Sequence, residues 1–465
     1  MSGKSFEELR KKYAVFSYDG YHIEKEKDGI LLSFDFSVDG LCSFKPTTKI
    51  MTDGSDVVNG IDDKTARAVV FSLGLVEAVS YWKAACPKRV EVKCGYLSED
   101  QKLWWKKLWY NGLGEFFFKN KITTDIESFV EINTMPCPEN EDEDVSFTSS
   151  GTSIVPVGGG KDSAVTLSLL SEIKDKIKCF TVNDQKARED TVTAAGIGKN
   201  SIVRTYRTID SELLRLNSEG FLNGHTPFSS IVAFLSLYCA YLTGADNIVL
   251  SNESSANEAT DIGSGVNHQY SKSYEFEKDF TDYVKKYFRL PIKYFSILRP
   301  FNELQISKMF ASLPQYHMIF RSCNAGSKKN IWCCSCAKCL FVSIILSPFV
   351  ERRELIKIFG CEMLDKKELT DDFYGLIGLG KTKPFECIGT VEEVVCALTE
   401  TVKKYRADGE KLPYLLELFD RTGIRYSGED LLKNFNSENL VPEKFLKYVA
   451  EMFDFVSKAD RPHQG

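Results

Sequence analysis

One stretch of this chain decides its fold, Ser153-Ile154-Val155-Pro156-Val157-Gly158-Gly159-Gly160-Lys161-Asp162-Ser163, followed by Ala164-Val165-Thr166-Leu167-Ser168-Leu169-Leu170. Its first five residues predict a buried strand, its three glycines a sharp turn, and the apolar run after Ser163 a helix with a polar N-terminus. Three consecutive glycines leave the turn without β-carbons, so backbone N–H groups can approach an anion closely. The helix N-terminus and the Lys161 ammonium add positive potential. The stretch therefore predicts a cradle for a phosphate group.

The spacing of the glycines matches neither of the two common nucleotide motifs. A kinase-type P-loop needs Gly-x4-Gly-Lys-[Ser/Thr], and the dinucleotide-binding fingerprint needs Gly-x-Gly-x-x-Gly. The stretch instead resembles the Ser-Gly-Gly-x-Asp-Ser loop of the PP-loop ATP pyrophosphatases, with Gly158 in place of the leading Ser. That resemblance implies an adenine nucleotide alpha hydrolase-like fold in which the loop holds the pyrophosphate of ATP while the enzyme adenylates a substrate.

The composition is that of a soluble globular protein, with 465 residues of which 43% are hydrophobic and 27% are charged. The first twenty residues contain no apolar stretch suited to a signal peptide, and the longest apolar runs, 231–242 and 340–350, are too short to span a bilayer. We therefore expect a cytoplasmic protein without membrane insertion. Its fourteen cysteines are then expected to be free thiols and metal ligands rather than a disulfide framework. A net charge of −6 with scattered Lys and Arg argues against a large nucleic-acid surface.

The first part of the chain carries strand and helix patterns of a different kind. Alternating apolar and polar residues over 20–24 and 30–38, separated by the turn signal Lys27-Asp28-Gly29, predict an antiparallel hairpin. Helices are predicted over 66–82 and 98–110. The second of these helices carries three tryptophans at helical spacing, which is typical of a core or of an interface between domains.

After residue 152, short β-rich runs alternate with helical patterns. Runs over 178–182, 201–205 and 247–250, with a helix over 229–243, predict a parallel sheet flanked by helices. Ligands bind at the carboxyl ends of such strands, so the polar residues that follow them are candidate site residues. They are Asn183 and Asp184, candidates for contact with the base or ribose of a nucleotide, and Ser251, Asn252 and Glu253, candidates for the reacting centre. The alternative for each of these residues is a helix N-cap.

Two of the five histidines lie in polar loops beside this sheet edge. His225 follows Asn223 and Gly224, and His268 lies within Asn267-His268-Gln269-Tyr270-Ser271-Lys272-Ser273. Histidine exchanges protons near neutral pH, and loops at a sheet's carboxyl edge are where catalytic groups are commonly placed. Both are candidate catalytic residues, and the alternative for each is a hydrogen-bonded structural histidine.

The pattern Cys323-x9-Cys333-x2-Cys336-x2-Cys339 is the second strong signal. Four thiolates on two short loops suit tetrahedral zinc, and a closed four-sulfur site is structural. The spacing is similar to that of the zinc knuckle in the PP-loop deazaguanine nitrile synthases. The alternative is a cluster of buried or redox-active thiols. Cys334 is an additional thiol, so the sequence leaves open whether Cys333 or Cys334 is the second ligand.

The remaining chain predicts helices over 340–346, 391–404 and 444–455, with a loop over 375–390 whose Lys383 is a candidate basic group for the site. The fold class is therefore α/β, with a PP-loop parallel sheet flanked by helices, an α+β N-terminal domain and a zinc-stapled helical C-terminal segment. The predicted parts are 1–135, the N-terminal domain; 136–151, an acidic linker; 152–322, the PP-loop ATP-binding catalytic domain; 323–339, the four-cysteine zinc knuckle; and 340–465, the helical C-terminal region.

Several motifs together resemble one bacterial family. They are the glycine loop 155–163, Leu222-Asn223-Gly224-His225, Leu250-Ser251-Asn252-Glu253, Asn267-His268-Gln269-Tyr270-Ser271-Lys272-Ser273, Phe295-Ser296-Ile297-Leu298-Arg299-Pro300 and Lys383-Pro384-Phe385-Glu386-Cys387. The family is that of the ATP-dependent UDP-N-acetyl-α-D-muramoyl-L-alanyl-L-glutamate epimerases of peptidoglycan precursor synthesis, and the resemblance covers nearly the whole chain. Ser254 departs from it, because an arginine commonly follows Asn-Glu in the family.

The resemblance implies an isomerase that converts the terminal L-glutamate of UDP-N-acetylmuramoyl-L-alanyl-L-glutamate to D-glutamate through an acyl-adenylate, releasing AMP and diphosphate. It implies ATP, Mg²⁺ and structural zinc as cofactors. The residues assigned on this basis are: for catalysis His268, His225, Glu253 and Lys161; for ATP Gly158, Gly159, Gly160, Lys161, Asp162, Ser163, Asn183, Asp184, Ser251 and Asn252; for the dipeptide substrate Asn223, Asn267, Gln269, Lys272, Arg299 and Lys383; for magnesium Asp162; and for zinc Cys323, Cys333, Cys336 and Cys339.

Two other functions are compatible with the same motifs. A PP-loop ligase or nitrile synthase would adenylate another carboxylate and capture it with ammonia or an amine, and no glutaminase domain is visible in the sequence. A non-catalytic, zinc-stapled ATP-binding module would bind ATP without producing AMP.

Overall fold

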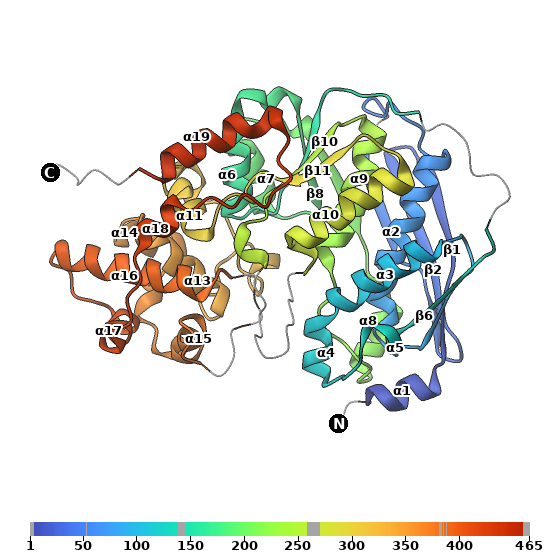
Figure 1. Cartoon of the computed structure of the whole chain (residues 1–465), viewed down its shortest axis with the longest axis horizontal. Coiled ribbons are helices and arrows are strands. Elements are labelled where there is room, and N and C mark those ends of the chain that lie inside the picture. The colour runs from blue at the N-terminus through green and yellow to red at the C-terminus, as the bar shows by residue number, and fades with distance from the viewer. Residues whose placement is uncertain are drawn as a thin grey trace.

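The strands of both halves of the chain join in one sheet (Figure 1). The computed structural model describes residues 4–52, 54–137, 146–257, 270–380, 384, 386 and 388–458. Within these ranges eleven strands form the sheet. They are β1 (Val15–Glu26), β2 (Gly29–Val38), β3 (Cys42–Phe44), β4 (Thr47–Met51), β5 (Arg89–Val92), β6 (Glu131–Thr134), β7 (Ser153–Pro156), β8 (Ile177–Val182), β9 (Ile202–Arg207), β10 (Asn247–Leu250) and β11 (Lys293–Ser296).

Helices cover both faces of the parallel strands β7 and β10. Those before β11 are α1 (Phe6–Lys12), α2 (Lys64–Trp82), α3 (Glu99–Gly112), α4 (Gly114–Asn120), α5 (Ile126–Phe129), α6 (Lys161–Leu169), α7 (Lys186–Ala194), α8 (Ser211–Ser218), α9 (Phe228–Thr243) and α10 (Tyr274–Tyr283). Those after it are α11 (Glu303–Ala311), α12 (Pro314–His317), α13 (Ala337–Leu346), α14 (Arg352–Phe359), α15 (Thr370–Leu376), α16 (Val391–Ala407), α17 (Tyr414–Thr422), α18 (Gly428–Lys433) and α19 (Leu446–Val456). None of the described helices is both long and apolar enough to cross a membrane.

The strand order is β11-β10-β7-β8-β9-β4-β2-β1-β5-β6, with β3 paired to β2. From β11 to β9 all pairings are parallel, which confirms the predicted parallel sheet, and β1 and β2 form the predicted antiparallel hairpin. The two parts meet where β4 pairs antiparallel with β9, through Thr48 with Arg207 and Ile50 with Thr205. An edge strand presents unpaired N–H and C=O groups, and β4 satisfies those of β9. Strands that the sequence analysis assigned to separate segments thus share one continuous backbone pairing.

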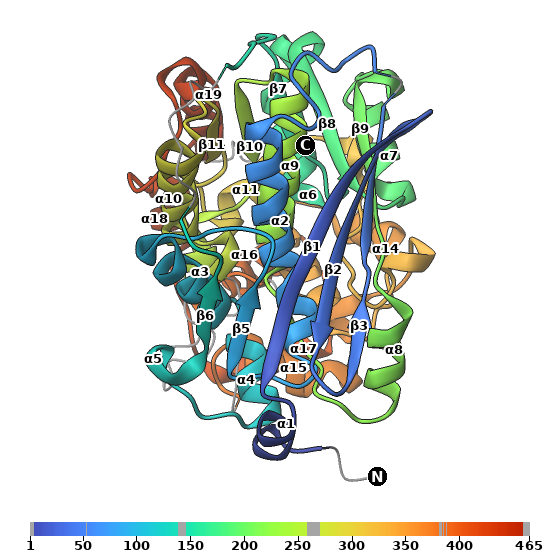
Figure 2. The ribbon, with the colours of Figure 1, turned by 90° about the vertical axis from the view of Figure 1, so that its right-hand side faces the viewer.

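Alternate residues of the central strands enter two different hydrophobic cores. On β7 and β10, Ile154 and Ile248 lie in a core with α2, α3, α9 and α10, whereas Val155 and Val249 lie in a core with α6, α11, α13 and α16. This alternation follows from the two-residue period of a strand. Figures 1 and 2 show the result as three layers, with α2 beside α9 on one face and α6, α11 and the C-terminal helices on the other. The C-terminal helices therefore complete the second core instead of standing apart from the sheet.

Two of the three tryptophans of α3 are buried in the core, and Trp104 is partly buried against it. Trp105 and Trp109 are each 1% exposed, and the Trp105 indole donates a hydrogen bond to Tyr283 of α10 over 3.1 Å. Trp105 also stacks on Phe234 of α9, with ring centroids 5.2 Å apart. The helix α3 thus fastens the first part of the chain to helices that flank the parallel strands.

A buried ion pair adds a second link between the two parts of the sheet. Arg207 at the end of β9 donates to both oxygens of Glu77 on α2, over 2.8 and 2.6 Å, and the two side chains are 10% and 2% exposed. We expect Glu77→Gln to lower the free energy of unfolding by about 3 kcal/mol, because the buried guanidinium loses its charged partner. Denaturant titration measures this.

The matched control is Glu131→Gln, which makes the same change in an exposed pair with Lys88. We expect no measurable change in its unfolding midpoint, because exposed pairs contribute little. Equal effects of the two substitutions would contradict this account of the junction.

Candidate active site

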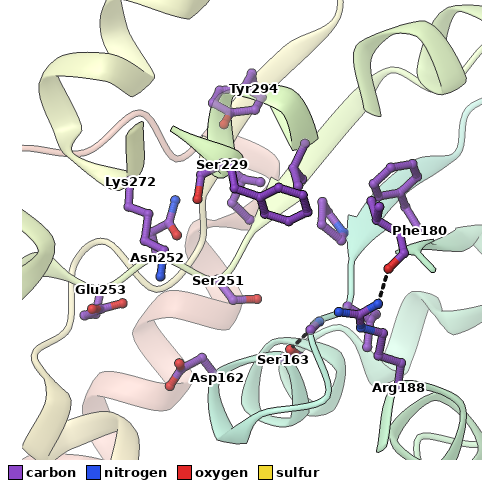
Figure 3. A pocket seen from close by; sticks show the side chains of 17 residues that line it. Asp162, Ser163, Phe180, Arg188, Ser229, Ser251, Asn252, Glu253, Lys272 and Tyr294 are labelled. Atoms are coloured by element: carbon purple, nitrogen blue, oxygen red, sulfur yellow. Dashed lines mark hydrogen bonds between the residues drawn. The ribbon is translucent and has the colours of Figure 1, made fainter. Parts of the chain in front are cut away.

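The strand order reverses between β7 and β10, and a pocket lies at that reversal (Figure 3). From β7 the chain continues to β8 on one side of β7, whereas β10 pairs with β7 on the other side. The connections that follow the carboxyl ends of β7 and β10 therefore run in opposite directions and leave a crevice. The pocket has a volume of about 260 Å³ and is lined from the ends of β7, β8 and β10, from the start of α9, and by Lys272 and Tyr294. The residues after β7 and β10 that the sequence singled out thus meet at one place.

The glycine loop follows β7 and ends at the N-terminus of α6. Gly159 has a φ of +79°, and a β-carbon there would lie 2.9 Å from the backbone of Ala187 and Arg188. The position therefore requires glycine. Gly158 N donates to Ser163 Oγ over 3.1 Å, which closes the loop, and Gly160 caps α6 without a side-chain hydrogen bond. An uncapped helix N-terminus leaves backbone N–H groups available to an anion.

Lys161 does not line this pocket. Its side chain is 3% exposed, and its ammonium pairs with the carboxylates of Asp162 and Glu303, the first residue of α11. Burial by itself would lower the pKa of Lys161, but the two carboxylates raise it above its usual value, so the lysine stays charged. Burial raises the pKa of Glu303, which the nearby Lys161 opposes. Lys161, which the sequence predicted to contact a phosphate, is thus paired with a carboxylate from α11 that the sequence analysis did not identify.

A second buried carboxylate fixes Glu303 from behind. Glu393 on α16 accepts hydrogen bonds from the Glu303 backbone N–H over 2.8 Å and from Ser255 Oγ over 2.6 Å, and its other oxygen accepts from Thr390 N. Gly389 packs against it, since a β-carbon there would lie 2.4 Å from Glu393 Oε2. One carboxylate therefore holds together α11, α16 and the segment that follows β10.

The residues after β10 face the pocket as predicted from their position. Ser251, Asn252 and Glu253 all line it, and Glu253 is 7% exposed. Among the described residues, Ser251 Oγ is buried and has no hydrogen-bond partner. Leaving such a hydroxyl unsatisfied is costly, so a ligand that hydrogen-bonds to it would be stabilised.

Arg188 is a pocket residue that the sequence analysis missed. Its guanidinium donates to the carbonyl oxygens of Val182 and Asn183 at the end of β8, and burial lowers its pKa. Its Nε has no hydrogen-bond partner among the described residues. Figure 3 shows it across the pocket from Lys272. Its backbone takes part in the contact that requires Gly159, and its position on α7 is set by the tertiary structure and leaves no motif in the sequence.

The two predicted residues after β8 are exposed and lie outside the pocket lining. Asn183 adopts a φ of +60°, and its Oδ1 accepts from Arg207 N over 2.9 Å. Asp184 accepts from the Tyr206 hydroxyl over 3.0 and 2.9 Å. In this structure both side chains shape the turn at the end of β8.

Arg299 is fully buried behind the pocket. It is 0% exposed and pairs with Glu277 of α10 over 3.0 Å, and it also donates to the backbone carbonyls of Glu253 and Lys272. Lys272 itself lines the pocket. The predicted substrate-binding arginine therefore supports the pocket wall, and the lysine faces the cavity.

The loop with Asn223 and His225 lies beside α4. His225 Nδ1 is 3.7 Å from the buried carboxylate of Glu115, and neither His225 nor Asn223 lines the pocket. Lys83 donates to Asn223 Oδ1 over 3.0 Å and to Gly224 O over 2.6 Å, and burial lowers its pKa to about 8. Asn267, His268, Gln269 and Lys383 lie outside the described residues.

The four predicted cysteines form one cluster. The ligand atoms of Cys323, Cys333, Cys336 and Cys339 all lie within 4.8 Å of one another. Cys339 Sγ is 3.7 Å from Cys333 Sγ and 3.5 Å from Cys336 Sγ, close to the roughly 3.8 Å edge of a tetrahedron with metal–sulfur bonds of about 2.3 Å. The side-chain hydrogen bond between Cys336 and Cys339 lowers the pKa of Cys336 to about 5, which favours a thiolate. The donor set and its geometry fit a metal ion.

Cys334 points away from this cluster. Its Sγ donates to Phe359 O over 3.2 Å, and its φ of +54° turns the backbone between the two neighbouring cysteines. The cluster therefore contains the thiol of Cys333 and not that of Cys334, the two candidates that the sequence left open. Glu386 reaches the same region by accepting a hydrogen bond from Asn324, the neighbour of Cys323.

Comparison with known proteins assigns the chain to a family. Residues 7–297 match the MurL N-terminal domain and residues 319–420 match the MurL C-terminal domain. The chain belongs to the MurL family. The first match covers every described strand and the pocket residues named above, and the second covers the cysteine cluster and α13 to α16.

Two relatives in the MurL family span most of the chain. A protein of Micromonospora sp. is 31% identical over 404 residues, which are 84% of this chain and 88% of its own length. A protein of Xanthomonas oryzae pv. oryzae is 30% identical over 329 residues, 69% of this chain and 71% of its own. Both are named UDP-N-acetyl-alpha-D-muramoyl-L-alanyl-L-glutamate epimerase. This MurL chain is thus similar to enzymes of the isomerase class.

The orientation of the cysteines predicts which thiols hold metal. We expect one metal ion per chain, its loss and a lower melting temperature in Cys336→Ser, and full metal content in the matched control Cys334→Ser. Mass-spectrometric metal analysis with thermal unfolding measures both. Metal retained by Cys336→Ser, or lost from Cys334→Ser, would contradict the assignment.

Proposed function

We propose that this chain is an ATP-dependent epimerase that converts the terminal L-glutamate of UDP-N-acetylmuramoyl-L-alanyl-L-glutamate to D-glutamate in peptidoglycan precursor synthesis. The observation that carries the proposal is the family match over residues 7–297, which contain the glycine loop after β7 at the strand-order reversal. The names of the two relatives suggest the substrate.

ATP would enter the pocket with its phosphates toward the glycine loop. The loop offers backbone N–H groups, and Ser251 Oγ and Arg188 Nε are buried polar atoms without a partner among the described residues. Asp162 and Glu253 line the same pocket, and Glu303 lies behind it, so the site also carries negative charge. A polyphosphate would be repelled there unless a cation offsets it, which fits Mg²⁺ at Asp162. We assign cleavage between the α- and β-phosphates, with AMP and diphosphate as products.

Activation of the carboxylate makes epimerisation chemically accessible. Removing the Cα proton next to an ionised carboxylate would place a second negative charge beside the first. Attack of the carboxylate on the α-phosphate, with diphosphate as the leaving group, replaces that charge with an acyl phosphate (a mixed anhydride) whose carbonyl accepts the electron pair left at Cα. The proton returns on the opposite face, and water then releases the D-glutamyl carboxylate and AMP.

Two of the proposed residue roles follow from positions in the pocket. Lys272 would bind an anionic group of the substrate, and Glu253 would orient a base or a water, since both line the pocket. His268 and His225 are the proposed proton-transfer groups. Asn223, Asn267, Gln269 and Lys383 are proposed to contact the substrate, whereas the buried contacts of Arg299 favour a supporting role.

We assign zinc to the four-cysteine cluster, because a closed four-thiolate set is typical of structural zinc. Metal there would hold the loop after α12 against the N-terminus of α13, because Cys339 is the third residue of that helix. It takes no part in the proposed reaction.

The reaction itself is tested by isotope incorporation. In D₂O with ATP, magnesium and the UDP-muramoyl dipeptide, we expect solvent deuterium at Cα of the D-glutamyl product, with AMP and diphosphate formed in step. Mass spectrometry, chiral analysis and phosphate chromatography measure these. Production of ADP would contradict the PP-loop assignment, and exchange at Cα without ATP would contradict activation by adenylation.

The buried Lys161 is tested against an exposed lysine of α7. We expect Lys161→Ala to lower kcat by about 100-fold or more, because the site loses its charge next to the glycine loop. Lys186→Ala removes an exposed lysine of α7 that pairs with Asp190, and it should leave kcat unchanged. The double variant Lys161→Gln/Glu303→Gln removes both charges of the buried pair, so neither is left without its partner. A loss of kcat in this variant, if it folds, is then a loss of chemistry and not of folding. Normal turnover in a folded Lys161 variant would exclude a role for this lysine.

A further inference from the structure

Glu277 of α10 is the centre of a buried network directly behind the pocket. Its Oε1 accepts from the Ser296 backbone N–H over 3.1 Å, and its Oε2 accepts from Arg299 Nη2 over 3.0 Å and from Arg299 Nε over 3.3 Å. Glu277 is 1% exposed, and Arg299 and Ser296 are each 0% exposed. None of these three side chains lines the pocket.

The other contacts of the network all end on the backbone of pocket residues. Arg299 Nη1 donates to Glu253 O over 2.6 Å, and Arg299 Nη2 donates to Lys272 O over 2.6 Å. Ser296 Oγ donates to Asn252 O over 2.6 Å. Figure 3 shows Asn252, Glu253 and Lys272 together along one side of the pocket. Three hydrogen bonds from the network thus hold the backbone carbonyls of the three polar residues on that side.

The geometry requires an arginine in a fixed orientation. A planar guanidinium presents several donors in a rigid fork, so it reaches two carbonyls and a carboxylate at once, which a lysine cannot do. Glu277 sets that orientation through two nitrogens, and it also holds Ser296. Without its carboxylate, the guanidinium would lose its only charged partner among the described residues.

We propose that Glu277 is a positioning residue, which through Arg299 and Ser296 sets the placement of Glu253, Lys272 and Asn252 for the reaction. This proposal rests on the proposed function for its kinetic part. Its structural part, the ordering of the backbone at these three residues, holds for whatever ligand the pocket takes.

The chain provides a matched control in Glu77 and Arg207. That pair is also buried and also bidentate, over 2.8 and 2.6 Å, and neither residue lines the pocket. Glu277→Gln and Glu77→Gln therefore make the same chemical change in two comparable pairs. A merely structural role would give both variants the same pattern of effects.

The test compares the full-length variants by hydrogen exchange and by kinetics. We expect Glu277→Gln to speed amide exchange in residues 250–257 and 270–276 and to lower kcat by about 100-fold, since displaced catalytic groups lose alignment. Glu77→Gln should change neither, although both variants lose stability. Ser296→Ala keeps the ion pair, and it should speed exchange only around Asn252, with a smaller loss of kcat. It provides the readout if Glu277→Gln does not fold.

Each result decides a separate point. Equal exchange in the two Gln variants, or normal kcat in a folded Glu277→Gln protein, would overturn the positioning role. A wild-type protein that inverts no glutamate would instead overturn the proposed function. The exchange measurement alone would then test whether Glu277 orders the backbone at residues 252, 253 and 272.

Discussion

The ion pair between Lys161 and Glu303 is the interaction on which the rest of the site depends. It joins the glycine loop after β7 to the first residue of α11, and both side chains are 3% exposed. A buried ammonium is costly unless it is paired, so Lys161 and its two carboxylates constrain one another. Because Glu393 holds the backbone of Glu303, this constraint extends to α16 and to Ser255. The C-terminal helices are thereby part of the active-site structure.

Two carboxylate networks support the pocket from opposite directions. Glu393 acts from the C-terminal side, on α11 and Ser255, and Glu277 acts from α10, on Arg299 and Ser296. Both meet the segment that follows β10. The pocket side chains Asn252 and Glu253 lie on that segment, between the two networks. Such supports fix the charged groups that line the pocket, and displaced charges would lose their complementarity to a ligand.

Much of the fold was predictable, and the reasons are local. The period of apolar residues and the turn signals located the hairpin, the strands β7 to β10 and the long helices α2, α3, α9, α13, α16 and α19 to within a few residues, because these patterns act over one element at a time. The shorter strands β3 to β6, the edge strand β11 and most of the short helices were not predicted. The cysteine spacing located the four-cysteine cluster for the same local reason. The pairing of β4 with β9 was not predictable, since nothing in either strand specifies a partner more than 150 residues away along the chain. The same holds for Arg188, Glu303 and Glu277, which carry no local motif.

The sequence by itself determined the chemistry available to this protein: a loop of three glycines after a strand, polar residues at the end of β10, and four thiols at metal-ligand spacing. Only the tertiary structure decided how each group is used. It buried Lys161 between two carboxylates, turned Cys334 away from the cluster, and placed Arg299 behind the pocket instead of in it. The physical reason is that the identity of a side chain sets its charge and reach, whereas burial and the choice of partner come from segments distant in the sequence that pack against it.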